Sequence, residues 1–134
     1  MITLTGIVTK GLRGATTSFQ KQLAFFDLPG IKALQNGSIN LNIAPWTFSI
    51  KKFDYLFPHI EWEPDRIEDF GFINVSNITY RGLSYDQPGY IYIPHGNPHF
   101  SDPSLLEIIC IPIPKIYYGS LIQITIPDDR LTLS

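Results

Sequence analysis

The chain has 134 residues, of which 16% are charged and 13% are aromatic, and its net charge is −2. This length is typical of a single domain, here residues 1–134, that can bury a core without metals or disulfides. Because the net charge is negative, we expect no polymeric nucleic acid as a partner, although a few local donors are enough to bind one nucleotide. Cys110 is the one cysteine, so no disulfide can form within the chain.

The first third of the chain predicts a strand, a glycine loop, a helical insertion and a second strand. Residues 2–9 alternate and are rich in Ile, Leu, Val and Thr, which is typical of a strand. Apolar residues recur at helical spacing over 18–27, and a second short helix is predicted over 30–35. Residues 38–43 alternate strictly, which predicts a strand with one apolar and one polar face.

The rest of the chain predicts further short strands. We expect them, in chain order, at 47–50, 70–80, 90–93, 105–111 and 121–126. The alternation of apolar and polar residues changes phase within 70–80, which indicates a bulge. Residues 53–69 contain Pro58, Pro64 and several acidic residues and predict a long surface excursion. Residues 82–89 predict a turn, and a polar tail begins at Asp128.

Six or seven short strands with one short helical insertion indicate a mostly β fold, either a barrel or a sandwich. The chain does not begin with a basic segment followed by a long apolar run. No apolar stretch reaches the ~18 residues that a membrane-spanning helix needs. We therefore expect a cytoplasmic monomer without a membrane partner.

Ser38 and Asn40 are two residues apart on a predicted strand, so both side chains point the same way. A hydroxyl oxygen beside an amide oxygen can bind Mg²⁺ when substrate phosphates complete the coordination shell. Alternatively, both residues could lie on the solvent-exposed face of a strand that has no binding function.

Gly6 lies within the first predicted strand, and Gly11 and Gly14 follow it, with Lys10 and Arg13 beside them. Glycines at such a place let a backbone approach a phosphate closely. The spacing matches neither a P-loop nor a dinucleotide fingerprint, and a plain turn is the other interpretation.

Glu107 lies inside the apolar run 105–111. A carboxylate there is costly unless it is paired or lines a pocket, where it could act as a base or a hydrogen-bond acceptor. The alternative is a glutamate that points outward from a half-exposed strand.

The segment from Gly89 to His99 resembles the second metal-binding motif of cupins, in which Gly, Pro, Gly and His recur at similar intervals. The first cupin motif is matched only in part, by His59 and Glu61.

Taken in order, these segments resemble the CTP-dependent riboflavin kinases over nearly the whole chain. The matched stretches are Gly6–Gly14, Gly37–Asn40 for the family's Gly-Thr-Leu-Asn, Phe48–Tyr55, Gly89–Pro94 with His99, Leu106–Ile109 and Gly119–Ile124. The chain departs from the family at Ile111–Gly119, where a longer helical connection is replaced by a short one.

The resemblance implies a six-stranded cradle-loop β-barrel that transfers the γ-phosphoryl group of CTP to the 5′-hydroxyl of riboflavin and so produces FMN. In the family, the Thr and the Asn of the motif bind Mg²⁺. Here these roles fall on Ser38 and Asn40, and serine keeps the hydroxyl that threonine supplies. Glu107 is our candidate for holding the substrate hydroxyl or an edge of the ligand.

The resemblance also implies two sets of ligand contacts. The nucleotide would lie against Lys10, Gly11, Leu12, Arg13, Gly14 and Ala15. The flavin would lie against Tyr90, Tyr92, His99 and Phe100. Two other functions stay open, namely a non-catalytic nucleotide- or flavin-binding module on the same barrel, and a cupin-like metalloprotein.

Overall fold

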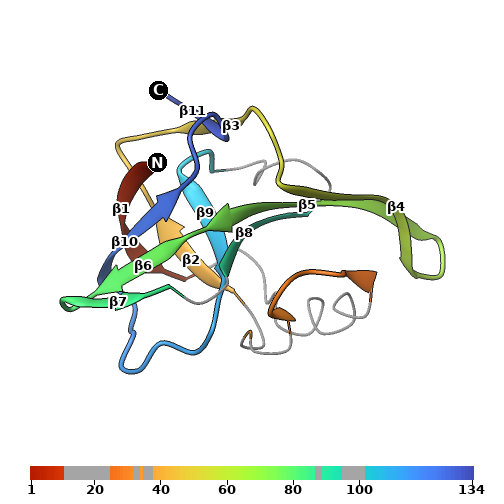
Figure 1. The fold of residues 1–134 in the computed structure, drawn as a ribbon. Helices are drawn as coiled ribbons and strands as arrows, with labels where there is room; N and C mark the ends of the chain where they lie inside the picture. The colour runs from red at the N-terminus through yellow and green to blue at the C-terminus, as the bar shows by residue number, and fades with distance from the viewer. Residues whose placement is uncertain (11–24, 32–33, 35–37, 87–88, 95–101) are drawn as a thin grey trace.

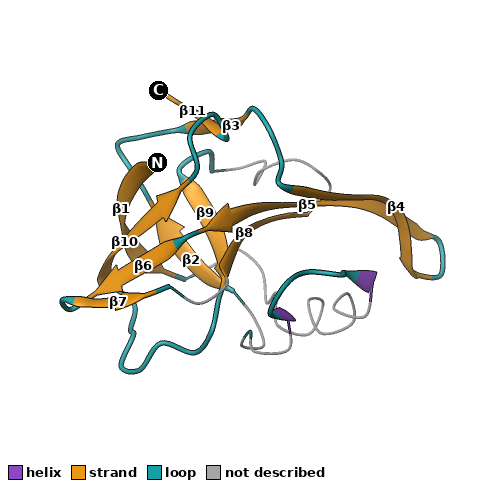
Figure 2. Cartoon of the chain, in the orientation of Figure 1, coloured by secondary structure: helices purple, strands orange, loops and turns teal. Residues whose placement is uncertain are grey.

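The structure is a computed structural model that describes residues 1–10, 25–31, 34, 38–86, 89–94 and 102–134. Strands account for most of these residues, and the expected mostly β class is confirmed (Figure 2). Among the described residues only Phe25 and Ile31 are helical, each in a single 3₁₀ position. Most of the helix predicted at 18–27 and half of the helix predicted at 30–35 lie outside the described residues. The described segments contain no helix that is both long and apolar enough to cross a bilayer.

The described chain forms eleven strands, several of which match the predicted ones closely. They are β1 (Ile2–Thr9), β2 (Ile39–Asn42), β3 (Phe48–Ile50), β4 (Tyr55–Glu63), β5 (Arg66–Val75), β6 (Asn77–Tyr80), β7 (Leu83–Tyr85), β8 (Gly89–Pro94), β9 (Leu105–Ile109), β10 (Leu121–Ile126) and β11 (Leu131–Leu133). The predicted turn at 82–89 therefore contains a short strand, β7. The interruption predicted within 70–80 is Ser76, which separates β5 from β6.

Nine of the strands form one antiparallel sheet in the order β4-β5-β8-β9-β2-β1-β10-β6-β7, and β3 pairs with β11 (Figure 1). β5 pairs with β8 near one end of this order, whereas β6 pairs with β10 near the other. Yet β5 and β6 are successive parts of the same stretch of chain. Ser76 between them donates from its backbone N–H (2.9 Å) and from Oγ (3.1 Å) to the carbonyl of Thr125 on β10. The six-stranded barrel itself stays a prediction.

Two hydrophobic clusters lie on opposite faces of the sheet. Residues that alternate along the strands, such as Ile39, Leu41 and Ile43, form the larger cluster. The second cluster is largely aromatic and includes Phe26, Phe70, Phe72, Tyr90 and Tyr92. In Figure 1 the segment 25–31 lies beside the β5–β8 part of the sheet, in agreement with the contact of the Phe26 ring with Phe72 at 4.9 Å between centroids.

The segment 53–69, which we predicted as a long surface excursion, forms a β-hairpin of β4 and the start of β5. Its register shifts between Phe57 and Ile60, where Pro58 and His59 interrupt the alternation. Proline is tolerated because β4 is an edge strand that needs hydrogen bonds on one side only. The backbone N–H of His59 donates instead to Oδ1 of Asp69 (2.9 Å).

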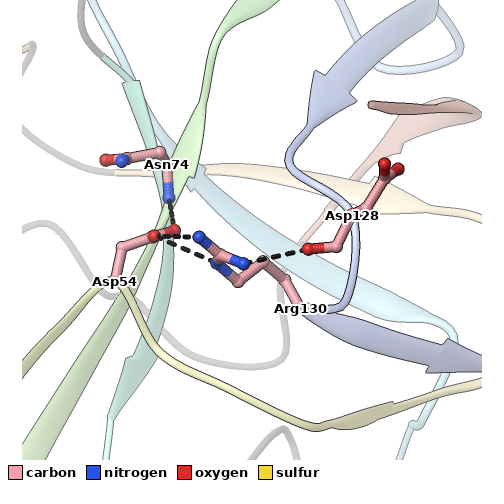
Figure 3. Close-up of polar contacts among 4 residues, drawn as sticks. All are labelled: Asp54, Asn74, Asp128 and Arg130. Atoms are coloured by element: carbon pink, nitrogen blue, oxygen red, sulfur yellow. Dashed lines mark hydrogen bonds and ion pairs between the residues drawn. The ribbon is translucent and has the colours of Figure 1, made fainter.

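The prediction of a polar tail from Asp128 is wrong, because β11 pairs with β3 and Arg130 is held by Asp54 (Figure 3). Nε and Nη2 of Arg130 donate to Oδ1 of Asp54 at 3.0 and 2.8 Å, and the backbone N–H of Asn74 donates to Oδ2 at 2.9 Å. Burial acts to raise the pKa of Asp54, but these hydrogen bonds outweigh it and hold the pKa below its ordinary value of 3.8.

Candidate functional site

The polar face of β2 holds two oxygen atoms that have no hydrogen-bond partner among the described residues. Alternation along the strand buries Ile39 and Leu41 on one side and turns Ser38, Asn40 and Asn42 to the other. Oδ1 of Asn42 accepts from the backbone N–H of Ala44 (2.9 Å). By contrast, Ser38 Oγ and Asn40 Oδ1 are buried and unpaired. Such atoms are costly in a fold and call for an explanation, such as a bound ion or ligand.

The register of the sheet places a carboxylate beside this pair. Asn40 lies opposite Glu107 on β9 and opposite Thr9 on β1, so these three residues form one row across three strands. Residues directly opposite each other in an antiparallel pair share a face, with Cβ atoms roughly 4.5–5.5 Å apart. Glu107 is 7% exposed and is the one buried charged residue of the described chain.

A cavity of about 590 Å³ opens beside Thr9 and Asn40, whereas Glu107 is not among its lining residues. This volume is within the size range of small-molecule sites. The residues that line this cavity are Val8, Thr9, Ser38, Ile39, Asn40, Ile116, Tyr117 and Tyr118. A second cavity of about 370 Å³ shares Val8, Thr9 and Tyr118 with the first and adds Ile7, Asn42, Ala44 and Gly119. The predicted pair Ser38 and Asn40 thus lies in a concave site, together with residues that the sequence did not single out.

Of the predicted nucleotide-binding residues, Lys10 alone is described. It is exposed and directly follows Thr9, which lines both cavities. Gly11, Leu12, Arg13, Gly14 and Ala15 lie outside the described residues. Gly6 lies inside β1, where an added Cβ would be 2.6 Å from Cγ of Leu41 and 2.8 Å from the carbonyl oxygen of Asn42. The structure thus gives Gly6 a packing role between β1 and β2.

Tyr90 and Tyr92, predicted to contact the flavin, are buried in the aromatic cluster. The hydroxyl of Tyr90 donates to the carbonyl of Pro29 (2.6 Å), and burial, with a smaller effect of Tyr55, raises its pKa to about 12. The ring of Tyr92 stacks on Phe70 with centroids 6.3 Å apart. His99 and Phe100 lie outside the described residues, so flavin contact stays a prediction for this set.

The chemistry of the unpaired oxygens fits Mg²⁺. Mg²⁺ prefers oxygen ligands, keeps several waters and is often bound by only one or two protein groups together with substrate phosphates. A hydroxyl and an amide oxygen from one strand can supply that small share of the coordination shell. Within the described ranges, no three His, Cys, Asp or Glu side chains gather as a metal site. Of the histidines proposed for a cupin site, His59 is exposed on the β4–β5 hairpin, and His95 and His99 lie outside the described residues.

Sequence reasoning missed Thr9, Tyr117 and Tyr118 as members of the site. Thr9 ends an ordinary alternating strand, and no local signal distinguishes it from Thr3 or Thr5. The two tyrosines do carry a signal, because they precede Gly119 in a short connection between two apolar strands. A turn that displays two aromatic residues to solvent is a recognisable candidate for ligand contact. No family model matches the chain, and a search of curated proteins found no match.

Proposed function

We propose that the chain is a Mg²⁺-dependent phosphotransferase that transfers the γ-phosphoryl group of CTP to the 5′-hydroxyl of riboflavin. The observation that carries this proposal is the pair of buried, unpartnered oxygens of Ser38 and Asn40 at the wall of the cavity. They occupy the two positions that the resemblance to CTP-dependent riboflavin kinases assigns to Mg²⁺. Phosphoryl transfer requires mainly positioning and charge neutralisation, so a site without a nucleophile is adequate.

Ser38, Asn40 and Glu107 have distinct tasks in this proposal. Ser38 Oγ and Asn40 Oδ1 would hold Mg²⁺, which would supply positive charge that neutralises the phosphates of CTP. Glu107 accepts a hydrogen bond from the riboflavin 5′-hydroxyl and thereby orients it toward the γ-phosphorus. As the new O–P bond forms and the bond to the β-phosphate oxygen breaks, the hydroxyl proton passes to the Glu107 carboxylate and CDP leaves.

A six-stranded closed barrel belongs to the same proposal, and the strand order supports it. The strands would be β1, β2, β8, β9, β10 and the continuous stretch formed by β5 and β6. Because this stretch pairs with β8 through its first half and with β10 through its second, it would join the two ends of the sheet. A sheet closed in this way would have no exposed strand edge between β8 and β10.

The proposal is tested by incubating the purified chain with riboflavin, Mg²⁺ and CTP, and by separating the products by chromatography. We expect FMN with CTP, and a parallel reaction with ATP reports the choice of donor. A folded chain that produces no FMN with either nucleotide would contradict the proposed reaction. Saturable binding of CTP or riboflavin without product would then favour the binding module on the same barrel.

A further inference from the structure

Tyr117 and Tyr118 lie in a tightly bonded turn between β9 and β10. The backbone N–H of Ser120 donates to the carbonyl of Tyr117 (3.0 Å), and the backbone N–H of Tyr117 donates to Ser120 Oγ (3.0 Å). Gly119 occupies the third position with a φ of 93°, the conformation that a type II turn requires there. Tyr118 therefore sits at the second position of a turn whose backbone is fixed from within.

Neighbouring elements fix this turn from outside as well. The backbone N–H of Gly119 donates to the carbonyl of Val8 (2.7 Å), and the backbone N–H of Val8 donates to the carbonyl of Ser120 (2.8 Å). On the preceding side, the carbonyl of Lys115 accepts from the hydroxyl of Tyr80 (2.5 Å). Despite this anchoring, the side chains of Tyr117 and Tyr118 are 67% and 74% exposed.

The exposed rings border the site of the unpaired oxygens. Both tyrosines line the larger cavity with Ser38 and Asn40, and Tyr118 also lines the second cavity. A tyrosine on a fixed turn loses little conformational entropy when a ligand covers its ring, because its backbone is already ordered and only two side-chain torsions remain. Planar heterocycles stack favourably on such rings.

We propose that the Tyr117–Ser120 turn is the platform on which the heteroaromatic base of the nucleotide stacks, with the phosphates directed toward Ser38 and Asn40. This inference rests on the proposed function and extends it to nucleotide recognition. One cavity is lined both by oxygens suited to a cation–phosphate group and by exposed aromatic rings, so one molecule that carries a phosphate chain and a planar ring fits both. Riboflavin has the ring but no phosphate.

Calorimetric titration with three probes separates ring binding from phosphate binding. The probes are CTP with Mg²⁺, inorganic tripolyphosphate with Mg²⁺, and riboflavin. For Tyr118→Ala we expect CTP to bind about 10-fold more weakly, equivalent to ~1.4 kcal/mol, while tripolyphosphate binds as before. Tyr118→Phe keeps the ring and should bind CTP like the unmodified chain. Leu83→Ala, at a 61% exposed residue on β7, is the matched surface control.

Each other result has a definite meaning. Equal affinity of Tyr118→Ala and Tyr118→Phe for CTP, when the unmodified chain binds CTP and forms FMN, would overturn the platform and leave the proposed function intact. Weaker binding of riboflavin but not of CTP would overturn the assignment of the ring to the nucleotide. If the unmodified chain binds none of the three probes, both the platform and the proposed function fail. Circular dichroism of each variant verifies that it is folded.

Discussion

Asn40 on β2 lies directly opposite Glu107 on β9, so a buried amide oxygen without a partner and the one buried carboxylate of the described chain share a face of the sheet. Burying the amide oxygen of Asn40 without a hydrogen-bond partner destabilises a fold. Asn40 and Thr9, which also lie opposite each other, line a cavity large enough for a small molecule. This arrangement is more easily explained by a ligand than by the needs of packing.

Asn40→Ala should separate stability from activity. We expect FMN formation to be lost, because the variant lacks one of the two oxygens proposed to hold Mg²⁺. The free energy of unfolding should stay within about 0.5 kcal/mol or rise, since the amide oxygen that is removed has no partner. Chemical denaturation and the FMN assay measure the two quantities.

Ser38 and Ser49 provide matched controls for this variant. Ser38→Thr keeps the hydroxyl and should retain activity, whereas Ser38→Ala should lose it. Ser49→Ala changes an exposed serine on β3 and should alter neither quantity. Full activity of Asn40→Ala would remove the metal role from this strand.

Glu107→Gln should slow phosphoryl transfer while CTP still binds. The amide has nearly the same shape as the carboxylate but cannot accept the hydroxyl proton, and loss of a general base costs about 10²–10⁴-fold in rate. Single-turnover FMN formation and calorimetric titration of CTP separate the two effects. An unchanged rate would show that Glu107 is not the base.

Asp54→Asn should destabilise the chain at neutral pH by about 1–3 kcal/mol, because the charged hydrogen bonds from Arg130 are weakened. The pKa of Asp54 is lower in the folded state than in the unfolded state. The ionised Asp54 therefore contributes its full stabilisation at pH values above its unfolded-state pKa, near 3.8. This stabilisation is lost as the pH falls through the lower pKa of the folded state.

Urea unfolding at a series of pH values from 7 to 2 tests this linkage. The unmodified chain should lose more stability than Asp54→Asn at the acidic end of the series, so the two curves should converge. Parallel curves would mean that Asp54 is not the group that titrates.

Gly71→Ala should destabilise the chain by about 1–3 kcal/mol through overpacking. An added Cβ would lie 2.3 Å from Cε1 of Phe53, so the ring would have to leave its place against the larger hydrophobic cluster. In the background of Phe53→Ala the same substitution should cost much less. A double-mutant cycle by denaturation measures the coupling, and a coupling near zero would contradict this packing.

Cys110 should resist alkylation in the folded chain. Burial raises the pKa of its thiol to about 12, so roughly one molecule in 10⁴ carries the reactive thiolate at pH 8. Mass spectrometry should detect no adduct with iodoacetamide under native conditions and one adduct after denaturation. Rapid labelling under native conditions would show that the chain opens at Cys110, directly after β9.

Local patterns predicted the strands with strict alternation and the strand with a nearly continuous apolar run. Strict alternation placed Ser38 and Asn40 on the same side of β2, and the apolar run at 105–111, interrupted by Glu107, predicted β9, which is buried on both faces. The pattern failed at β4, because the bulge at Pro58 and His59 breaks the alternation and the acidic residues belong to an exposed edge.

Contacts between distant segments could not be predicted from the sequence. The opposition of Asn40 and Glu107 depends on the register between β2 and β9, to which residues far apart contribute. Arg130 is 76 positions from Asp54, so its role in binding the C-terminal segment to the residue directly before β4 leaves no local signature. The two tyrosines join the cavity only because the turn is bonded to β1.

The place of β10 between β1 and β6 has a consequence for biosynthesis. While the ribosome has released only the residues before 121, both neighbours of β10 have unpaired edges, although the other strands of the sheet are already available. Exposed edges of this kind promote association between nascent chains. The sheet can therefore be completed only after Leu121–Ile126 has emerged, and until then the nascent chain would gain from a chaperone that covers the edges of β1 and β6.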